Sequence, residues 1–344
     1  MTAYERVVLA MDHREPDRVP VSCMAENPAL YDHFAPGETD LLRAAALVHR
    51  GAGIDITYSV RRGLARGEDR VLEGGARVSG QTVWGRRRFA SLDELAAYQP
   101  ARVVVSPADE AAFIAHVRRE QAALEPETVV MRQGGAILGY YDIGVELYSL
   151  AMCDHPEAVE RLIAEQYERA RQWVDIVCRH RVGPVFQWCE DLAHKHGPMF
   201  SPDFYRRVLF PRLKDAAATV HRAGMKFLLH TDGDVTSLLD DIVAADVDGL
   251  NPLEQMDMAW CKRRYGDRLF FVGNVPSDVM ALGTPDQVWA ATERTILAGG
   301  RGGGMILDTS AGELMPDVPV ENALAYFAAA REIGRYPLGS ARRR

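Results

Sequence analysis

The segment of residues 228–235, which reads LLHTDGDV, combines residue types that could do chemistry. His230 ends an apolar run, and Asp232 follows two residues later, directly before a glycine. An imidazole and a carboxylate at this spacing could hold a metal ion or exchange protons with a substrate. The plainer alternative is structural, because Asp-Gly is a common turn pair and aspartate often caps a helix. We predict that His230 and Asp232 are catalytic.

Further carboxylates stand where they could join such a site. Glu254 lies in the segment GLNPLEQ, beyond the next apolar run after His230. An oxygen ligand beside an imidazole suits zinc, so we predict a metal site of His230, Glu254 and Asp232; a solvated loop glutamate is the alternative. Glu190 and Asp191 follow another apolar run, and adjacent residues of an extended strand face opposite sides. We predict that Glu190, the direct extension of that run, points inward and is catalytic.

Side chains that could bind a substrate also stand at the ends of apolar runs. Arg132 and Gln133 end one run, while Asn251 and Asn274 stand at the ends of two others. Guanidinium and amide groups can donate hydrogen bonds to polar atoms of a small molecule. We predict that these four residues bind the substrate; polar cover at strand ends is the alternative.

The chain alternates between short apolar runs and amphipathic segments. Continuous apolar runs are typical of strands buried on both faces. Such runs occupy residues 18–24, 54–59, 128–133, 184–189, 226–230, 247–251, 269–273 and 304–308. Helical patterns occupy residues 39–50, 156–181, 202–223, 235–245, 285–298 and 320–334.

Eight strand-then-helix units predict an α/β protein with a closed (β/α)8 TIM barrel, and a doubly wound open sheet is the alternative. Barrel enzymes build their sites at the carboxyl ends of the strands, which is where the candidate residues stand. No glycine-rich phosphate-binding motif follows a strand, so we expect no nucleotide cofactor.

A segment of about residues 61–125 interrupts this alternation after the second strand. Residues 61–89 are glycine-rich with short alternating pieces, which predicts an inserted β-hairpin over the barrel mouth. Extra helices are predicted over residues 92–97 and 108–124. We treat residues 1–344 as a single barrel domain that carries this insertion.

Composition excludes several classes of protein. Hydrophobic residues make up 47% of the 344 residues and charged residues 26%, an ordinary globular balance. The formal net charge of -8 argues against a nucleic-acid partner. No apolar run approaches the about 20 residues that span a bilayer, so we expect no membrane partner. The charged N-terminus and five scattered cysteines favour a cytoplasmic protein with reduced thiols.

Several longer segments resemble the uroporphyrinogen decarboxylase superfamily. The similarity is strong over residues 184–335 and again at the N-terminus. It is carried by ERVVLAMDHREPDRVPV, GPMFSPDFYRRVLFPRLKDAAATVHRAGMKFLLHTDGDV, DGLNPLEQMDM, YGDRLFFVGNVPSDVMALGTPDQV and GGGMILDTSAGELMPDVPVENALAYF. The resemblance implies a (β/α)8 barrel, often a homodimer.

The sequence departs from the decarboxylase that gives the superfamily its name. That enzyme needs no metal and carries an arginine segment of the type MRQAGRY near its N-terminus. Here the equivalent region reads VSCMAENPAL and has no arginine. The similar letters MRQGG at residues 131–135 belong to the third apolar run. The absence of this arginine segment therefore argues against the haem-pathway enzyme itself.

A second branch of the superfamily resembles zinc methyltransferases that act with corrinoid proteins or thiols. Their ligands are His-x-Cys and a distant Cys, where this chain has His230-Thr231-Asp232 and Thr309-Ser310. Glu254 follows His230 by 24 positions, a separation that resembles the cobalamin-independent methionine synthase barrel. Losing both thiolates leaves a harder, oxygen-rich site. Relatives with an H-x-D-G motif look like methyl-ether demethylases, which pass a methyl group to a corrinoid carrier.

These observations favour a methyltransferase-like barrel enzyme that uses zinc. The enzyme would move a methyl group from a small methoxylated or methylated substrate to a corrinoid protein or another acceptor. One alternative is a metal-free decarboxylase or lyase that acts on a small carboxylate. Another is a barrel that only binds a ligand, since fold does not determine function.

Overall fold

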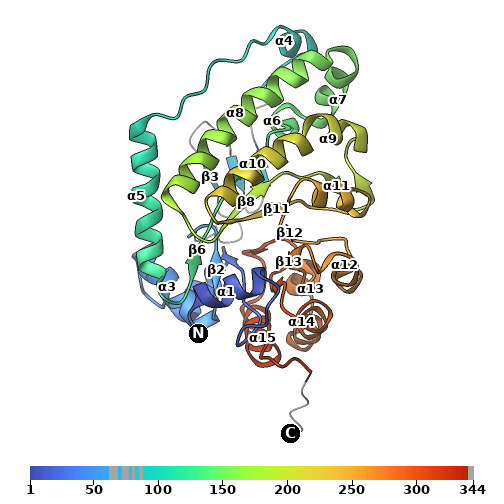
Figure 1. The fold of residues 1–344 in the computed structure, drawn as a ribbon. Coiled ribbons are helices and arrows are strands. Elements are labelled where there is room, and N and C mark those ends of the chain that lie inside the picture. Colours follow the sequence, from blue (N-terminus) through green and yellow to red (C-terminus); the bar gives the residue numbers. More distant parts are fainter. Residues whose placement is uncertain (62–68, 72–76, 80–81, 85–87, 340–344) are drawn as a thin grey trace.

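The computed structural model describes residues 1–61, 69–71, 77–79, 82–84 and 88–339. Strands occupy the centre of the molecule, and helices lie around them (Figure 1). The central strands are β1 (Met24–Ala25), β2 (Ile56–Thr57), β6 (Val129–Val130), β7 (Arg132–Gly135), β8 (Val185–Cys189), β11 (Lys226–His230), β12 (Gly249–Asn251), β13 (Phe270–Val272) and β14 (Met305–Ile306). Each overlaps a predicted apolar run, and the predicted α/β fold with a parallel sheet is confirmed.

Strand pairing follows the order of the chain. Six strands form one parallel sheet in the order β14-β13-β12-β11-β8-β7, and β2 pairs in parallel with β6. Only Met131 separates β6 from β7, so one apolar run supplies both strands. Isolated parallel bridges join Val21 to Leu307 and Ser22 to Ile56. The chain just before β1 therefore contacts both the end of β14 and β2.

The predicted helices form with small shifts of their ends. They are α3 (Leu41–Ala52), α8 (Pro156–His180), α11 (Leu239–Ala244), α14 (Pro285–Gly299) and α15 (Val320–Ile333). The helix predicted over residues 202–223 is instead two helices, α9 (Pro202–Val208) and α10 (Phe210–Arg222). Pro211 accounts for the break, because proline lacks an N–H and its ring clashes with the carbonyl four residues earlier.

The apolar pattern did not predict several short helices. These are α1 (Ala3–Met11), α2 (Pro28–Phe34), α6 (Tyr140–Ile143), α7 (Val145–Asp154), α12 (Met258–Tyr265) and α13 (Ser277–Leu282). Among the described residues, no helix is both long enough and apolar enough to cross a membrane.

The inner core lies between α1 and the strands. Val7 and Met11 of α1 pack in one cluster with inward-facing strand residues such as Leu228. Leu229, the next residue of β11, belongs to the outer core that includes the helices. Side chains alternate along a strand, so His230 shares the inward direction of Leu228. Local strand geometry therefore points His230 to the same face of the sheet as Leu228, the face that packs against α1.

The predicted insertion follows β2. Its described part contains the antiparallel strands β3 (Asp69–Val71), β4 (Arg77–Ser79) and β5 (Thr82–Trp84), paired in the order β3-β4-β5. Residues 62–68, 72–76, 80–81 and 85–87 of the predicted hairpin region lie outside the described residues. The two predicted helices are present as α4 (Leu92–Ala97) and α5 (Pro107–Leu124).

Candidate functional site

His230 stands at the carboxyl end of β11, in register with Asn251 of β12. Its Nδ1 lies 2.7 Å from Oδ1 of Asn251, whose side chain is buried. An amide oxygen can only accept a hydrogen bond, so Nδ1 carries the hydrogen in this arrangement. The lone pair of the imidazole is then on Nε2, the nitrogen that can bind a metal ion. Asn251, predicted to bind substrate, orients His230.

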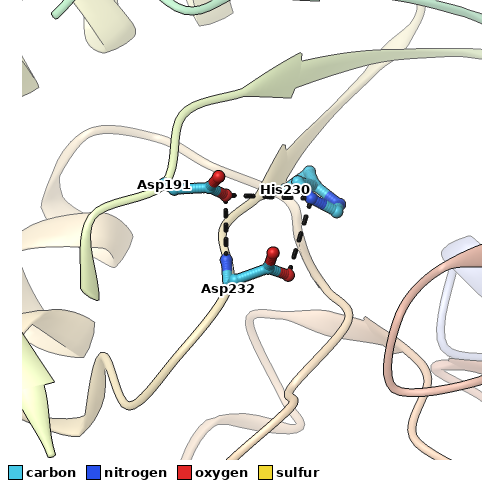
Figure 2. Close-up of side chains that lie close together, drawn as sticks. All are labelled: Asp191, His230 and Asp232. Atoms are coloured by element: carbon cyan, nitrogen blue, oxygen red, sulfur yellow. Dashed lines mark hydrogen bonds and ion pairs between the residues drawn. The ribbon is translucent and has the colours of Figure 1, made fainter. Parts of the chain in front are cut away.

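Two aspartates lie beside the free nitrogen of His230. Nε2 is 3.9 Å from Oδ1 of Asp191 and 3.7 Å from Oδ1 of Asp232. Figure 2 shows the three side chains converging at the ends of β8 and β11. The backbone N–H of Asp232 donates to Oδ1 of Asp191 at 3.2 Å, which links the two chain segments. We call these three residues the carboxylate–histidine cluster.

The Asp-Gly turn after His230 has the tight geometry that the sequence suggested. Gly233 has a φ of +79°, and an added Cβ would lie 2.6 Å from the backbone of Ala193 and of His194. Only glycine fits such a position without strain. The local turn bond is made by Asp234, whose Oδ1 accepts from the N–H of Thr236 at 2.9 Å. The side chain of Asp232 thus remains available to the cluster.

The cluster carries more negative than positive charge. Burial raises the pKa of Asp232 to about 6, and the charges of Asp191 and Glu254 raise it too, while His230 acts in the opposite direction. Carboxylates crowded in a partly buried place are stabilised by a cation. The electrostatics therefore favour a positively charged occupant.

The donor atoms fit a zinc ion. Zinc takes three protein ligands at catalytic sites, bonded at about 2.0–2.2 Å, which places tetrahedral ligand atoms about 3.3–3.6 Å apart. The separations from Nε2 of His230 are 3.7 and 3.9 Å, and the three donor atoms all lie within 4.8 Å of one another, so the side chains would have to close by up to about 1 Å around a zinc ion. One imidazole nitrogen and two carboxylate oxygens form a harder set than the thiolate sites of the family resemblance.

Glu254 lies next to the cluster rather than within it. Its Oε2 accepts from the N–H of Gly233 at 3.0 Å, which supports the turn that follows Asp232. Asn274 donates to the carbonyls of Leu253 and Met256 at 2.9 and 3.1 Å and so holds the loop that carries Glu254. Metal binding by Glu254 and substrate binding by Asn274 stay predictions.

The orientation expected for Glu190 is corrected by the structure. Its buried carboxylate accepts from the N–H groups of Ile137 and Leu138 at 2.7 and 3.1 Å. Burial raises the pKa of Glu190 to about 7. Alternation along the strand turns Asp191, not Glu190, toward His230. Catalysis by Glu190 stays a prediction, and its observed bonds hold the segment before α6 in place.

The structure separates Arg132 from Gln133. The buried Arg132 forms an ion pair with Glu120 of α5 and donates to the carbonyl of Tyr58 at 2.7 Å. Its guanidinium thus joins the strands to a covering helix. Gln133 accepts from Gln187 at 3.1 Å and continues the inward-facing series of its strand. Substrate binding by either residue stays a prediction, and the geometry favours Gln133.

Two acidic residues near the cluster were not predicted as site residues: Asp191, which was weighed against Glu190 and not chosen, and Glu313. Strand alternation, counted from an inward residue of β8, would have selected Asp191. Glu313 begins β15 (Glu313–Leu314), which pairs in parallel with β1. Burial, followed by the charge of Glu26, raises the pKa of Glu313 to about 7. Glu313 is far from β1 in sequence and lies outside the predicted apolar runs, so no local pattern pointed to it.

Cavities occur at both ends of the strands. A cavity of 240 Å³ is lined by polar, acidic and apolar residues: Ser277, Asp278, Met280, Ala281, Thr309, Glu313, Met315, Asp317 and Val318. Larger cavities of 470 and 480 Å³ lie where strands begin, near Val129 and Asp55 respectively. The residues that line the smaller cavity do not include Asp191, His230 or Asp232, but its Glu313 follows Gly312, where an added Cβ would lie 3.8 Å from Cε1 of His230.

Asp308, two residues beyond the end of β14, yields a prediction about pH. Burial raises its pKa to about 8, while the N–H of Thr309 donates to it at 2.7 Å. Between pH about 4 and about 8 the folded state keeps a proton that the unfolded state loses, so this group makes the free energy of unfolding fall as pH rises.

We expect Asp308→Asn to flatten that fall. Urea denaturation at pH about 5, 7 and 9, with a chelator present, measures the slope. The exposed Asp93→Asn serves as the matched control. An Asp308→Asn protein with the wild-type slope would contradict this prediction.

The parallel sheet and the carboxylate–histidine cluster at the carboxyl ends of its strands define an α/β protein whose candidate site stands where enzymes of this fold class place theirs. The family model described as uroporphyrinogen decarboxylase (URO-D) matches residues 117–333. The chain therefore belongs to the URO-D family, and the resemblance found in the sequence is confirmed.

Methyltransferases are among the relatives. Methylcobamide:CoM methyltransferase MtaA of Methanosarcina barkeri is 33% identical over 135 residues, which are 39% of this chain and 38% of that protein. The match thus spans well under half the length of this curated relative. A solved structure of a methyltransferase from Methanosarcina mazei aligns with 96% of this chain and 99% of its own, with a TM-score of 0.71 and 19% identity. At this identity the likeness shows a shared fold.

Proposed function

We propose that this protein is a zinc-dependent methyltransferase of the URO-D family. The observation that carries the proposal is the carboxylate–histidine cluster at the carboxyl ends of β8 and β11. The partial identity to a methylcobamide methyltransferase supports the type of reaction. We also infer that the parallel strands close into a (β/α)8 barrel, because Val21 bridges to Leu307 and Ser22 to Ile56.

Asp191, His230 and Asp232 would hold the zinc ion in this proposal. When bound, zinc supplies Lewis-acid polarisation of a heteroatom in the substrate. Asn251 fixes the imidazole so that Nε2 faces the two carboxylates. The N–H of Asp232 holds Oδ1 of Asp191, and Glu254 holds the turn behind Asp232. These contacts keep the donor atoms in place before any ligand arrives, which is the usual means of precise positioning.

The methyl donor would be a small methylated or methoxylated molecule, bound beside Glu313 in the cavity of 240 Å³. Gln133 and Asn251 do not line this cavity, but they lie on the side of the sheet to which His230 points. The acceptor would be a corrinoid protein or another nucleophile, a proposal supported by the partial identity to a methylcobamide:CoM methyltransferase. A homodimer in the cytoplasm completes the proposal.

Methyl transfer can be tested directly with zinc-loaded protein. We expect a methyl group to pass either from methoxylated aromatic compounds to cob(I)alamin or from methylcob(III)alamin to coenzyme M, with loss of activity on chelation and recovery on adding zinc. The corrinoid absorption spectrum reports both directions. If no methyl transfer occurs in either direction while metal-free protein releases carbon dioxide from small carboxylates, the decarboxylase alternative replaces this proposal.

A further inference from the structure

The two oxygens of the Asp191 carboxylate have different partners. Oδ1 accepts from the backbone N–H of Asp232 at 3.2 Å and is the oxygen 3.9 Å from Nε2 of His230. Oδ2 accepts from the hydroxyl of Tyr141, the second residue of α6. Figure 2 shows Asp191 directing one oxygen toward His230 and Asp232. One oxygen therefore faces the cluster, and the other is occupied by a tyrosine.

The tyrosine hydroxyl is held in place by its own element. Gly139 and Gly144 bound the short helix α6 in positive-φ conformations of 73° and 93°. The neighbouring Tyr140 donates to the backbone carbonyl of Asp191 at 2.8 Å and packs against the ring of Tyr141 with centroids 4.4 Å apart. The hydroxyl of Tyr141 thus donates to Asp191, whose backbone is itself held by Tyr140, although 69% of Tyr141 is exposed.

Glu190 anchors the chain leading into α6 from the same strand end. Its carboxylate accepts the N–H groups of Ile137 and Leu138, immediately before Gly139. The segment of residues 137–141 and the pair of residues 190–191 are therefore joined by several hydrogen bonds. The bond between Tyr141 and Asp191 is therefore supported by other hydrogen bonds on both of its chain segments. This support distinguishes it from a chance contact of an exposed side chain.

The bond from Tyr141 to Oδ2 affects which divalent cations the Asp191 carboxylate can bind well. Zinc is small and is usually four-coordinate, so it needs only one oxygen from each aspartate. Larger oxygen-preferring ions take six or more ligands and often use both oxygens of one carboxylate. Both oxygens of Asp191 accept a hydrogen bond, and Oδ1 is the one 3.9 Å from Nε2 of His230, so the Tyr141 hydroxyl on Oδ2 holds the carboxylate in the orientation that presents Oδ1 to the cluster.

We propose that Tyr141 is a positioning residue that limits Asp191 to one metal-binding oxygen and thereby favours zinc over larger oxygen-preferring divalent ions. This inference rests on the proposed function, since it requires the metal site. Tyr141 would act through Asp191, the residue to which its hydroxyl donates. It is therefore a determinant of metal choice.

The test compares Tyr141→Phe with wild type and with Tyr4→Phe, a tyrosine 55% exposed on α1. Phenylalanine keeps the ring and removes only the hydroxyl. Dissociation constants for Zn²⁺ and Mn²⁺ are measured by competition with a chromophoric chelator, and thermal melting checks folding. We expect zinc affinity to fall about 10-fold, the lower end for loss of a partner of a metal ligand. Manganese affinity should stay equal or rise, while Tyr4→Phe changes neither.

Cobalt(II) provides an independent reading of the same change. Four-coordinate cobalt absorbs visible light more strongly than five- or six-coordinate cobalt, so Tyr141→Phe should weaken the absorption. An unchanged zinc-to-manganese ratio, or equal weakening for both ions, would overturn the proposal, because a merely structural contact affects both alike. If wild-type protein binds neither ion, the proposed function falls together with this inference.

Discussion

Replacement of His230 by alanine is expected to reduce methyl transfer by at least about 100-fold. Loss of an outer partner of a metal ligand alone costs about 10–100-fold, and His230 is itself the only nitrogen donor of the cluster. The variant also leaves Asp191 and Asp232 facing each other without the imidazole that lowers the pKa of Asp232. Initial rates and zinc affinity should both be measured.

The matched control for this variant is His33→Ala, an exposed histidine on α2. It should retain wild-type rates and zinc affinity. Wild-type activity in His230→Ala would exclude the cluster as the reaction site. Zinc binding without activity, in contrast, would show that His230 serves the substrate and not the ion.

Removal of Asp55 is expected to cost about 3–5 kcal/mol of unfolding free energy, the usual effect of breaking a buried ion pair from one side. Only 1% of the Asp55 side chain is exposed. It accepts from Arg6 and Arg18, each at 2.6 Å, and from the N–H of Val21 at 2.8 Å. Asp55→Ala would leave both guanidinium groups without this partner where α1 meets the strands.

Urea denaturation of Asp55→Ala and Glu127→Ala measures this difference. Glu127 pairs with Arg50 at 3.0 Å, but 33% and 64% of these two side chains are exposed. Such a pair contributes at most about 1 kcal/mol. If Asp55→Ala has the same free energy of unfolding as Glu127→Ala, the prediction is wrong, and the buried ion pairs of Asp55 add no more stability than the exposed pair of Glu127.

Much of the fold could be predicted because it depends on local patterns. Continuous apolar runs marked the central strands, and 3.6-residue periodicity marked the long helices. The break at Pro211 was predictable in principle, since proline disrupts a helix interior. The predicted helix over residues 202–223 placed Pro202 at its start but ran through Pro211.

The candidate site was predicted in part. His230 and Asp232 were found because they follow one strand within two residues. Strand alternation would have separated Arg132 from Gln133 and would have preferred Asp191 to Glu190. To use strand alternation, one must already know one residue that points inward. A run that is apolar at every position, because both faces are buried, does not show which residue that is. Contacts such as that of Tyr141 with Asp191 join distant loops and have no local pattern.

The zinc content of the purified protein, measured beside Asp191→Asn and Glu254→Gln, tests the central claim most directly. The account predicts about one zinc ion per chain in wild type, as expected for a single catalytic site. Glu254→Gln should keep the ion, because its amide oxygen can still accept from Gly233, whereas Asp191→Asn should lose it. Wild-type protein that takes up no zinc when zinc is offered, or an Asp191→Asn variant that keeps zinc while Glu254→Gln loses it, would contradict the account.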